Sequence, residues 1–143
     1  MIEYITRRQK TLAIILNSHF HKDGIEFFTP PEFSQQLAYM KRDKGYVISP
    51  HVHNPVPRKV HFTHEVLFVK SGKVRVDFYE QGDVYLESRV LLPGDVILLC
   101  EGGHGFTMLE DSEMIEVKQG PYMGENDKRR FKAVEEFLVV LKV

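Results

Sequence analysis

Cysteine is nearly absent from this chain of 143 residues, since Cys100 stands alone. One cysteine excludes an internal disulfide and a zinc site built from several thiolates. Because Cys100 follows an apolar run, we predict a small core residue there and not a nucleophile. The lack of disulfides suits a reducing compartment, so we expect the protein in the cytoplasm.

Long apolar runs and an excess of either charge are lacking as well. No stretch reaches the ~18 apolar residues of a membrane span, and residues 1–10 are not followed by the apolar run of a signal peptide. The chain has 19 basic and 20 acidic residues and shows no basic stripe along which a phosphate backbone would lie. The short basic cluster at residues 128–132 indicates a solvated face. We therefore expect neither nucleic acid nor a membrane as a partner.

Turn signals such as Asp23-Gly24 and Ser71-Gly72 recur every eight to twelve residues, which is typical of an all-β sandwich or barrel. Residues 73–79 alternate apolar and charged side chains, as a half-buried strand does. Residues 35–40 also fit a helix, but the turn after them favours a strand. The predicted strands cover residues 11–16, 25–29, 35–40, 46–49, 65–70, 73–79, 84–92, 96–99, 106–109 and 114–118.

Only residues 126–141 have the spacing of an α-helix. Asp127 would cap it, and Phe131, Val134 and Leu138 recur at helical intervals. Such a helix would cover an open sheet edge. We find no internal repeat or linker, so the chain is predicted to be one domain, residues 1–143.

Four side chains carry chemistry. His51 and His53 lie two apart in an extended stretch, where residues i and i+2 point to the same face. Glu65 opens an apolar strand and needs solvent, a cation or a metal as its partner. His104 lies among glycines, which leave space around its imidazole. Taken singly, each of the four also fits a solvated or core role without any ligand.

Taken together, these residues resemble the cupin family. In the first cupin motif five residues separate a Gly from His-x-His and, beyond a spacer, six residues separate a Glu from a second Gly. Here Gly45 precedes His51 and His53, and Glu65 precedes Gly72, at those spacings. The spacer, residues 54–64, is longer than is usual in the family.

The second cupin motif places Gly-Asp before a strand, a turn with glycine and a His. Here Gly94-Asp95 precede residues 96–100 and Gly102-Gly103-His104. The resemblance covers about residues 45–122, with N-terminal strands in residues 1–44. It implies a cupin jelly-roll β-barrel with the short C-terminal α-helix added, and a homodimer with an N-terminal strand packed between subunits.

The resemblance also implies a metal site. Cupins hold iron, manganese, nickel or zinc through three His and one Glu, and imidazole with carboxylate suits such ions. The matching residues here are His51, His53, Glu65 and His104. Because this ligand set leaves coordination positions open, we expect dioxygenase, isomerase or lyase chemistry on a small organic molecule.

Further residues are candidates for the same pocket. His61 is predicted as an acid/base in it, and His64 is the alternative, although both also fit an exposed rim. Arg75 and Lys118 lie in predicted strands, and if they face inward they would bind an anionic or carbohydrate-like ligand. Their alternative is an outward, solvated position.

Two other functions use the same pocket. One is a small-molecule binding or sensing module without turnover. The other is a metal-free sugar or sugar-nucleotide isomerase or epimerase, in which histidines act as acid and base.

Overall fold

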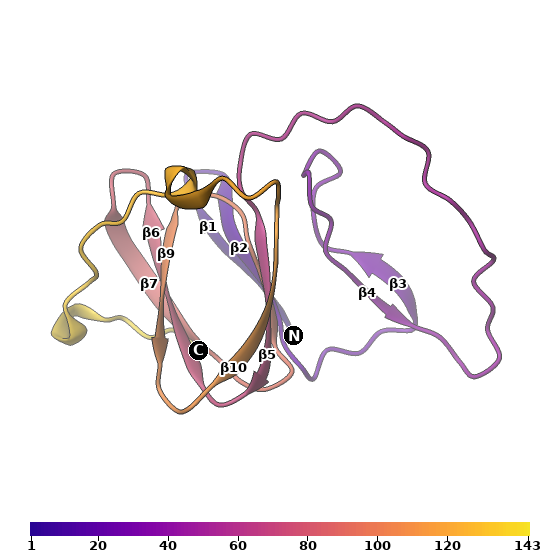
Figure 1. Cartoon of the computed structure of the whole chain (residues 1–143). Helices are drawn as coiled ribbons and strands as arrows, with labels where there is room; N and C mark the ends of the chain where they lie inside the picture. The colour runs from indigo at the N-terminus through magenta and orange to yellow at the C-terminus, as the bar shows by residue number, and fades with distance from the viewer. The chain divides into compact units, whose positions relative to one another are not determined.

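The computed structural model describes residues 1–143 as two compact units, Met1–Phe20 with Phe62–Val143, and His21–His61. Its regular structure is almost entirely antiparallel strand, in three sheets without a closed barrel, which confirms the all-β prediction (Figure 1). No helix has the length and apolar character needed to cross a membrane. The strands are β1 (Ile2–Arg7), β2 (Lys10–Leu16), β3 (Gly24–Phe27), β4 (Ala38–Lys41), β5 (Glu65–Ser71), β6 (Val74–Glu80), β7 (Val84–Leu91), β8 (Val96–Leu99), β9 (Gly103–Met108) and β10 (Glu113–Lys118).

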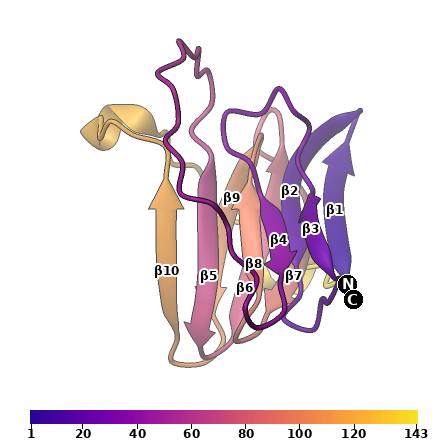
Figure 2. The ribbon, with the colours of Figure 1, turned by 90° about the vertical axis from the view of Figure 1, so that its right-hand side faces the viewer.

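The larger unit consists of two sheets that face each other. One has the strand order β1-β2-β8-β5-β10 and the other β7-β6-β9. Figure 2 shows β10 and β5 side by side, in the antiparallel register that pairs Lys118 with Glu65. The inward side chains of both sheets form one apolar core, which includes Leu67, Val76 and Ile97. Burial of this core is the main favourable term that holds the two sheets together.

Strand β6 is buried on both faces. Val74, Val76 and Phe78 face the core, as the alternation predicts, but Arg75 and Asp77 on the opposite face are buried as well. The half-buried strand expected from the sequence is therefore buried throughout. The cause is the C-terminal part of the chain, which packs against this outer face.

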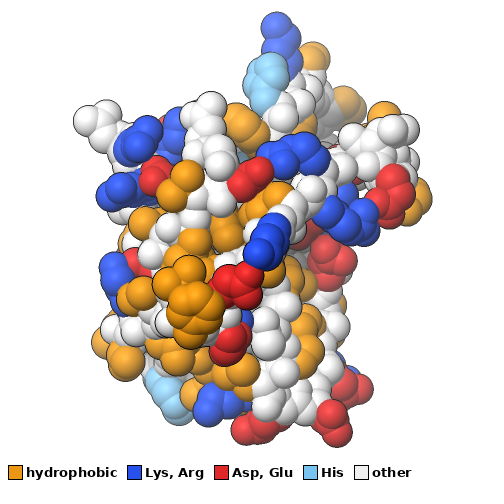
Figure 3. All heavy atoms as spheres, turned by 90° about the vertical axis from the view of Figure 1, so that its left-hand side faces the viewer, with side chains coloured by type: hydrophobic (Ala, Val, Ile, Leu, Met, Phe, Trp, Pro, Cys, Tyr) orange, Lys and Arg blue, Asp and Glu red, His pale blue; other side chains and the backbone are white.

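The α-helix predicted for residues 126–141 is wrong. This region contains only two 3-10 turns, η1 (Gly124–Asp127) and η2 (Glu136–Leu138). After η2 the tail (residues 139–143) is extended beside β7: the Ser88 amide donates to the Val140 carbonyl at 2.9 Å, and the Lys142 amide donates to the Ser88 carbonyl at 3.1 Å. Val139 and Val140 are β-branched and favour this extended form. The exposed edge of β7 supplies hydrogen-bond partners for the backbone in place of those within a helix. Hydrophobic side chains gather among charged ones on the face that carries β7 and the tail (Figure 3).

The smaller unit is built around one hairpin. Strands β3 and β4 pair antiparallel, with Ile25 opposite Met40. The strand predicted for residues 35–40 is confirmed in its second half, whereas the strand predicted for residues 46–49 is wrong, because no strand lies between β4 and β5. Gly45 has a positive φ of 91°, and the prolines at 50, 55 and 57 donate no backbone hydrogen bond. These features explain why residues 46–64 form no ladder.

Candidate functional site

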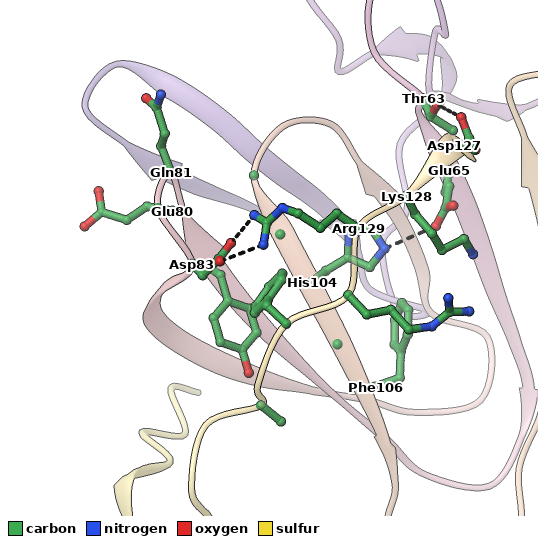
Figure 4. Close-up of a pocket in the computed structure, with 18 of the residues that line it drawn as sticks. Thr63, Glu65, Glu80, Gln81, Asp83, His104, Phe106, Asp127, Lys128 and Arg129 are labelled. Atoms are coloured by element: carbon green, nitrogen blue, oxygen red, sulfur yellow. Dashed lines mark hydrogen bonds and ion pairs between the residues drawn. The ribbon is translucent and has the colours of Figure 1, made fainter. Parts of the chain in front are cut away.

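Glu65 and His104 meet at one end of the larger unit, although they come from different sheets. Glu65 is the first residue of β5 and shares the inward face of that strand with Leu67. His104 lies on β9 opposite the core residue Phe78 of β6, so it also faces inward. His104 Nε2 lies 3.2 Å from Glu65 Oε2, within donating distance (Figure 4).

The surroundings of this pair favour an ionised carboxylate. The hydrogen bond from His104 lowers the pKa of Glu65 below its ordinary value, and the charges of Lys118 and Lys128 act in the same direction. Burial of Glu65 raises its pKa, but by less than these interactions lower it. Lys118 Nζ lies 3.9 Å from the other oxygen of Glu65.

A cavity of about 780 Å³ opens beside the pair. Glu65 and His104 line it together with aromatic side chains that are partly or fully buried, namely Tyr79, Phe106 and Phe131. The His104 and Phe106 rings are 5.5 Å apart. A mostly apolar hollow with a few converging polar groups is typical of a small-molecule site.

One wall of the cavity is a segment that begins at Asp127, the last residue of η1, and has no regular structure beyond it; we call it the strap (residues 127–134). It is tied down near its start, where the Thr63 hydroxyl donates to Asp127 Oδ1 at 3.0 Å, and by Arg129, which donates twice to Asp83 at 2.7 and 2.9 Å (Figure 4).

At its other end the strap is held by Tyr79. The Phe131 ring packs edge-on against the Tyr79 ring at 4.9 Å, and the Tyr79 hydroxyl accepts the Val134 amide at 3.0 Å. The basic side chains of residues 128–132 are exposed, as predicted for a solvated face. The sequence did not predict that Lys128, Arg129 and Arg130 also line the cavity. Aromatic Phe131 beside the charges is the one signal in the sequence that pointed to a packed segment.

Two glycines that flank His104 offer a test of the strap. A Cβ added at Gly103 would lie 2.7 Å from Phe131 Cζ, whereas one added at Gly105 would meet nothing within 4 Å. We expect Gly103→Ala to push Phe131 off Tyr79 and loosen the strap, with little change in the sheets.

The measurement is limited proteolysis with trypsin, which cleaves after Lys and Arg and therefore within residues 128–132. Cleavage there should be severalfold faster in Gly103→Ala than in the parent, since proteolysis follows local opening. Gly105→Ala is the matched control and should be cleaved at the parental rate. Equal rates in all three proteins would show that Phe131 does not hold the strap.

The other predicted ligands, His51 and His53, lie in the smaller unit. Their rings contact each other at 5.2 Å, nearly perpendicular, so the i, i+2 spacing does place them side by side. His51 Nδ1 lies 2.9 Å from the Ser49 carbonyl oxygen. With that nitrogen donating, Nε2 keeps a free lone pair. No group of three or more His, Cys, Asp or Glu side chains in the structure is arranged to hold a metal ion.

The remaining predicted residues are placed as follows. His61 is exposed in the smaller unit. His64 is 4% exposed, and its burial lowers its pKa. His64 does not line the cavity. Cys100 is buried, which raises the pKa of its thiol to about 12 and fits the predicted core role.

Neither Arg75 nor Lys118 is among the side chains that line the cavity, but Lys118 lies 3.9 Å from the lining residue Glu65. The Arg75 guanidinium is engaged by Glu136 and Asp77, which raise its pKa further.

The fold and the site define an all-β protein with two facing sheets and a carboxylate–imidazole pair in an open-ended cavity. No family model, no curated protein and no solved structure matches this chain.

Proposed function

We propose that this chain is a cupin-type metalloprotein, which holds one divalent transition metal ion and binds a small organic molecule in the cavity beside it. The proposed ligands are Glu65, His104, His51 and His53. The observation that carries the proposal is the approach of Glu65 to His104 across two sheets, at the wall of a cavity of small-molecule size.

The distance between these two donors suits a shared ion. Carboxylate oxygen and imidazole nitrogen bind zinc and similar ions at about 2.1 Å. Two such donors lie about 3.0 Å apart when they bind at right angles and about 3.4 Å apart at a tetrahedral angle. The 3.2 Å between Glu65 Oε2 and His104 Nε2 lies between these values.

The smaller unit supplies donors of the right kind. His51 has one ring nitrogen beside a backbone carbonyl, which is the outer contact that commonly orients a metal-binding imidazole. His53 lies against it. The cupin-like motif assigns both residues to the same ion as Glu65.

When bound, a divalent ion with open positions supplies Lewis acidity for dioxygenase, isomerase or lyase chemistry. The side chains of the protein would hold the ion, exclude water and move protons. Glu65 stays ionised and acts as an anionic donor. His104 offers Nε2 when its proton resides on Nδ1, and the aromatic wall excludes water from the apolar side of the ligand. His61 is the proposed acid/base.

One observation favours a second candidate, a metal-free isomerase or epimerase. The Glu65 carboxylate that accepts from His104 orients the imidazole. Such a pair acts as general acid and base without an ion.

Metal binding tests the first candidate. Protein stripped with a chelator is reloaded with Mn²⁺, Ni²⁺ or Zn²⁺, and the bound metal is measured by elemental analysis and calorimetry. We expect Glu65→Gln and His104→Ala to weaken the affinity by more than roughly 100-fold, the upper end of the loss seen for outer-shell partners.

The matched control is Glu113→Gln, because Glu113 is an exposed carboxylate on β10 paired only with surface groups. It should bind metal as the parent does. A parent that takes up no ion, or a Glu65→Gln variant with parental affinity, would refute the metal site. Turnover of sugar substrates by metal-free protein, lost in His104→Ala, would then support the second candidate.

A further inference from the structure

Four basic side chains come close to the cavity, and two of them are already neutralised. Arg129 forms a bidentate pair with Asp83, and Arg130 pairs with Glu125. The forked Arg129 pair satisfies the guanidinium with geometric specificity, whereas Arg130 donates to Glu125 through one nitrogen. Both arginines therefore already have an anionic partner.

The other two, Lys118 and Lys128, are not neutralised in this way. Lys118 lies on the inward face of β10, and its only ion pair is the 3.9 Å approach to Glu65, which is too long for a hydrogen bond. Lys128 lies on the strap, lines the cavity and forms no ion pair. Lys118 approaches Glu65 from β10, and Lys128 lines the same cavity as Glu65 from the strap.

The acidic side chains of the cavity are mostly occupied. Glu80 pairs with Arg7 and Arg8 outside it, and Asp83 is held by Arg129. Asp127 accepts from the Thr63 hydroxyl. Because the Thr63 hydroxyl is neutral, Glu65, Glu116 and Asp127 are the lining carboxylates left to balance the two lysines. A divalent ion at Glu65 would make this end of the cavity positive.

Aromatic rings also line the cavity. Tyr79 and Phe131 pack edge-on and form one aromatic wall, whereas Phe106 lies beside His104 on the inward face of β9. The volume of about 780 Å³ exceeds what an inorganic ion needs, and a hollow with cationic groups and an aromatic wall fits a molecule with an acidic group and an organic body.

We propose that the ligand of this cavity is a small organic anion, whose carboxylate or phosphate lies between Lys118 and Lys128 while its organic part packs on the aromatic wall. The proposal rests on the proposed function, because the bound ion both supplies positive charge and frees Lys118 from Glu65.

The test compares anions with their neutral counterparts. Metal-loaded protein is titrated calorimetrically, at constant ionic strength, with succinate and with glycerol 3-phosphate. Succinamide and glycerol serve as the neutral probes. We expect at least one anion to bind and both neutral probes to fail, and the stronger anion identifies the acidic group.

Methionine replaces each lysine, because it keeps most of the stem and removes the charge. Lys118→Met and Lys128→Met should each weaken anion binding by about tenfold or more, the effect of losing one hydrogen bond to a charged group. Lys132→Met is the matched control, since Lys132 lies on the same strap but pairs with Glu135 away from the cavity. It should bind as the parent does.

Metal content, measured in the same preparations, separates the two proposals. Normal metal uptake with anion binding that is lost in the lysine variants supports the anionic ligand. Three outcomes with normal metal uptake overturn the anionic ligand and leave the metal site standing. The parent binds no anion, it binds the neutral probes equally well, or the Lys118→Met, Lys128→Met double variant keeps the parental affinity. Absence of metal uptake by the parent overturns both.

Discussion

Replacing Asp77 with alanine is expected to destabilise the larger unit by about 3–5 kcal/mol, the cost of leaving a buried charge without its partner. Arg75 and Asp77 are 5% and 4% exposed, and Arg75 Nε donates to Asp77 Oδ1 at 2.8 Å. Asp77 also accepts from the buried Ser88 hydroxyl. In the Asp77→Ala variant the guanidinium keeps only Glu136 as its anionic partner, and that side chain is largely exposed.

The measurement is urea unfolding of the parent and the variant, followed by circular dichroism. Asp83→Ala is the control, because it also removes the partner of an arginine, but the Arg129 side chain is 71% exposed. Exposed ion pairs contribute little, so the control should lose far less stability. Similar losses in both variants would mean that the Arg75–Asp77 pair does not act as a buried charge pair.

Loss of the two adjacent imidazoles in the smaller unit should abolish metal binding. We expect about one equivalent of metal in the parent and almost none in a His51→Ala, His53→Ala double variant, since removing two ligands of four leaves too few donors. Elemental analysis of protein purified without added ions gives the answer. The two substitutions should leave the sheets intact, because His51 and His53 are exposed and lie outside every strand.

The chain contains a matched control for this pair. His19 and His21 have the same i, i+2 spacing and are also exposed. A His19→Ala, His21→Ala double variant should retain the parental metal content. If the two double variants hold equal amounts of metal, His51 and His53 are not ligands.

The strands were predictable because their alternation is local. The run that became β6 shows its inward residues directly in the sequence, and β2, β5, β7, β8 and β10 follow the apolar runs closely. The prediction that Glu65 and His104 lie near each other came from a motif, and the structure brings these two together. Their approach depends on two sheets facing each other, which no local pattern encodes.

The prediction for the C-terminal region was wrong because the contacts of that region are not local. The helical spacing of Phe131, Val134 and Leu138 is present, but these residues pack on distant partners instead of forming one helical face. Phe131 contacts Tyr79, and the Val134 amide donates to the Tyr79 hydroxyl, 55 residues away. Propensity is a weak prior where tertiary contacts offer a competing set of hydrogen bonds. The position of Lys128 in the lining of the cavity depends on the same long-range packing, so the sequence did not predict it.

The strap has a consequence for biosynthesis. Thr63 and Asp127, which hydrogen-bond across the cavity, are 64 positions apart, and every strand precedes the strap in the chain. On the ribosome, both sheets can therefore assemble before residues 127–134 emerge, and the pocket acquires its last wall only afterwards. A nascent chain would thus be compact before it is able to retain a ligand, so that ligand capture reports the docking of the strap and not merely the formation of the β-structure.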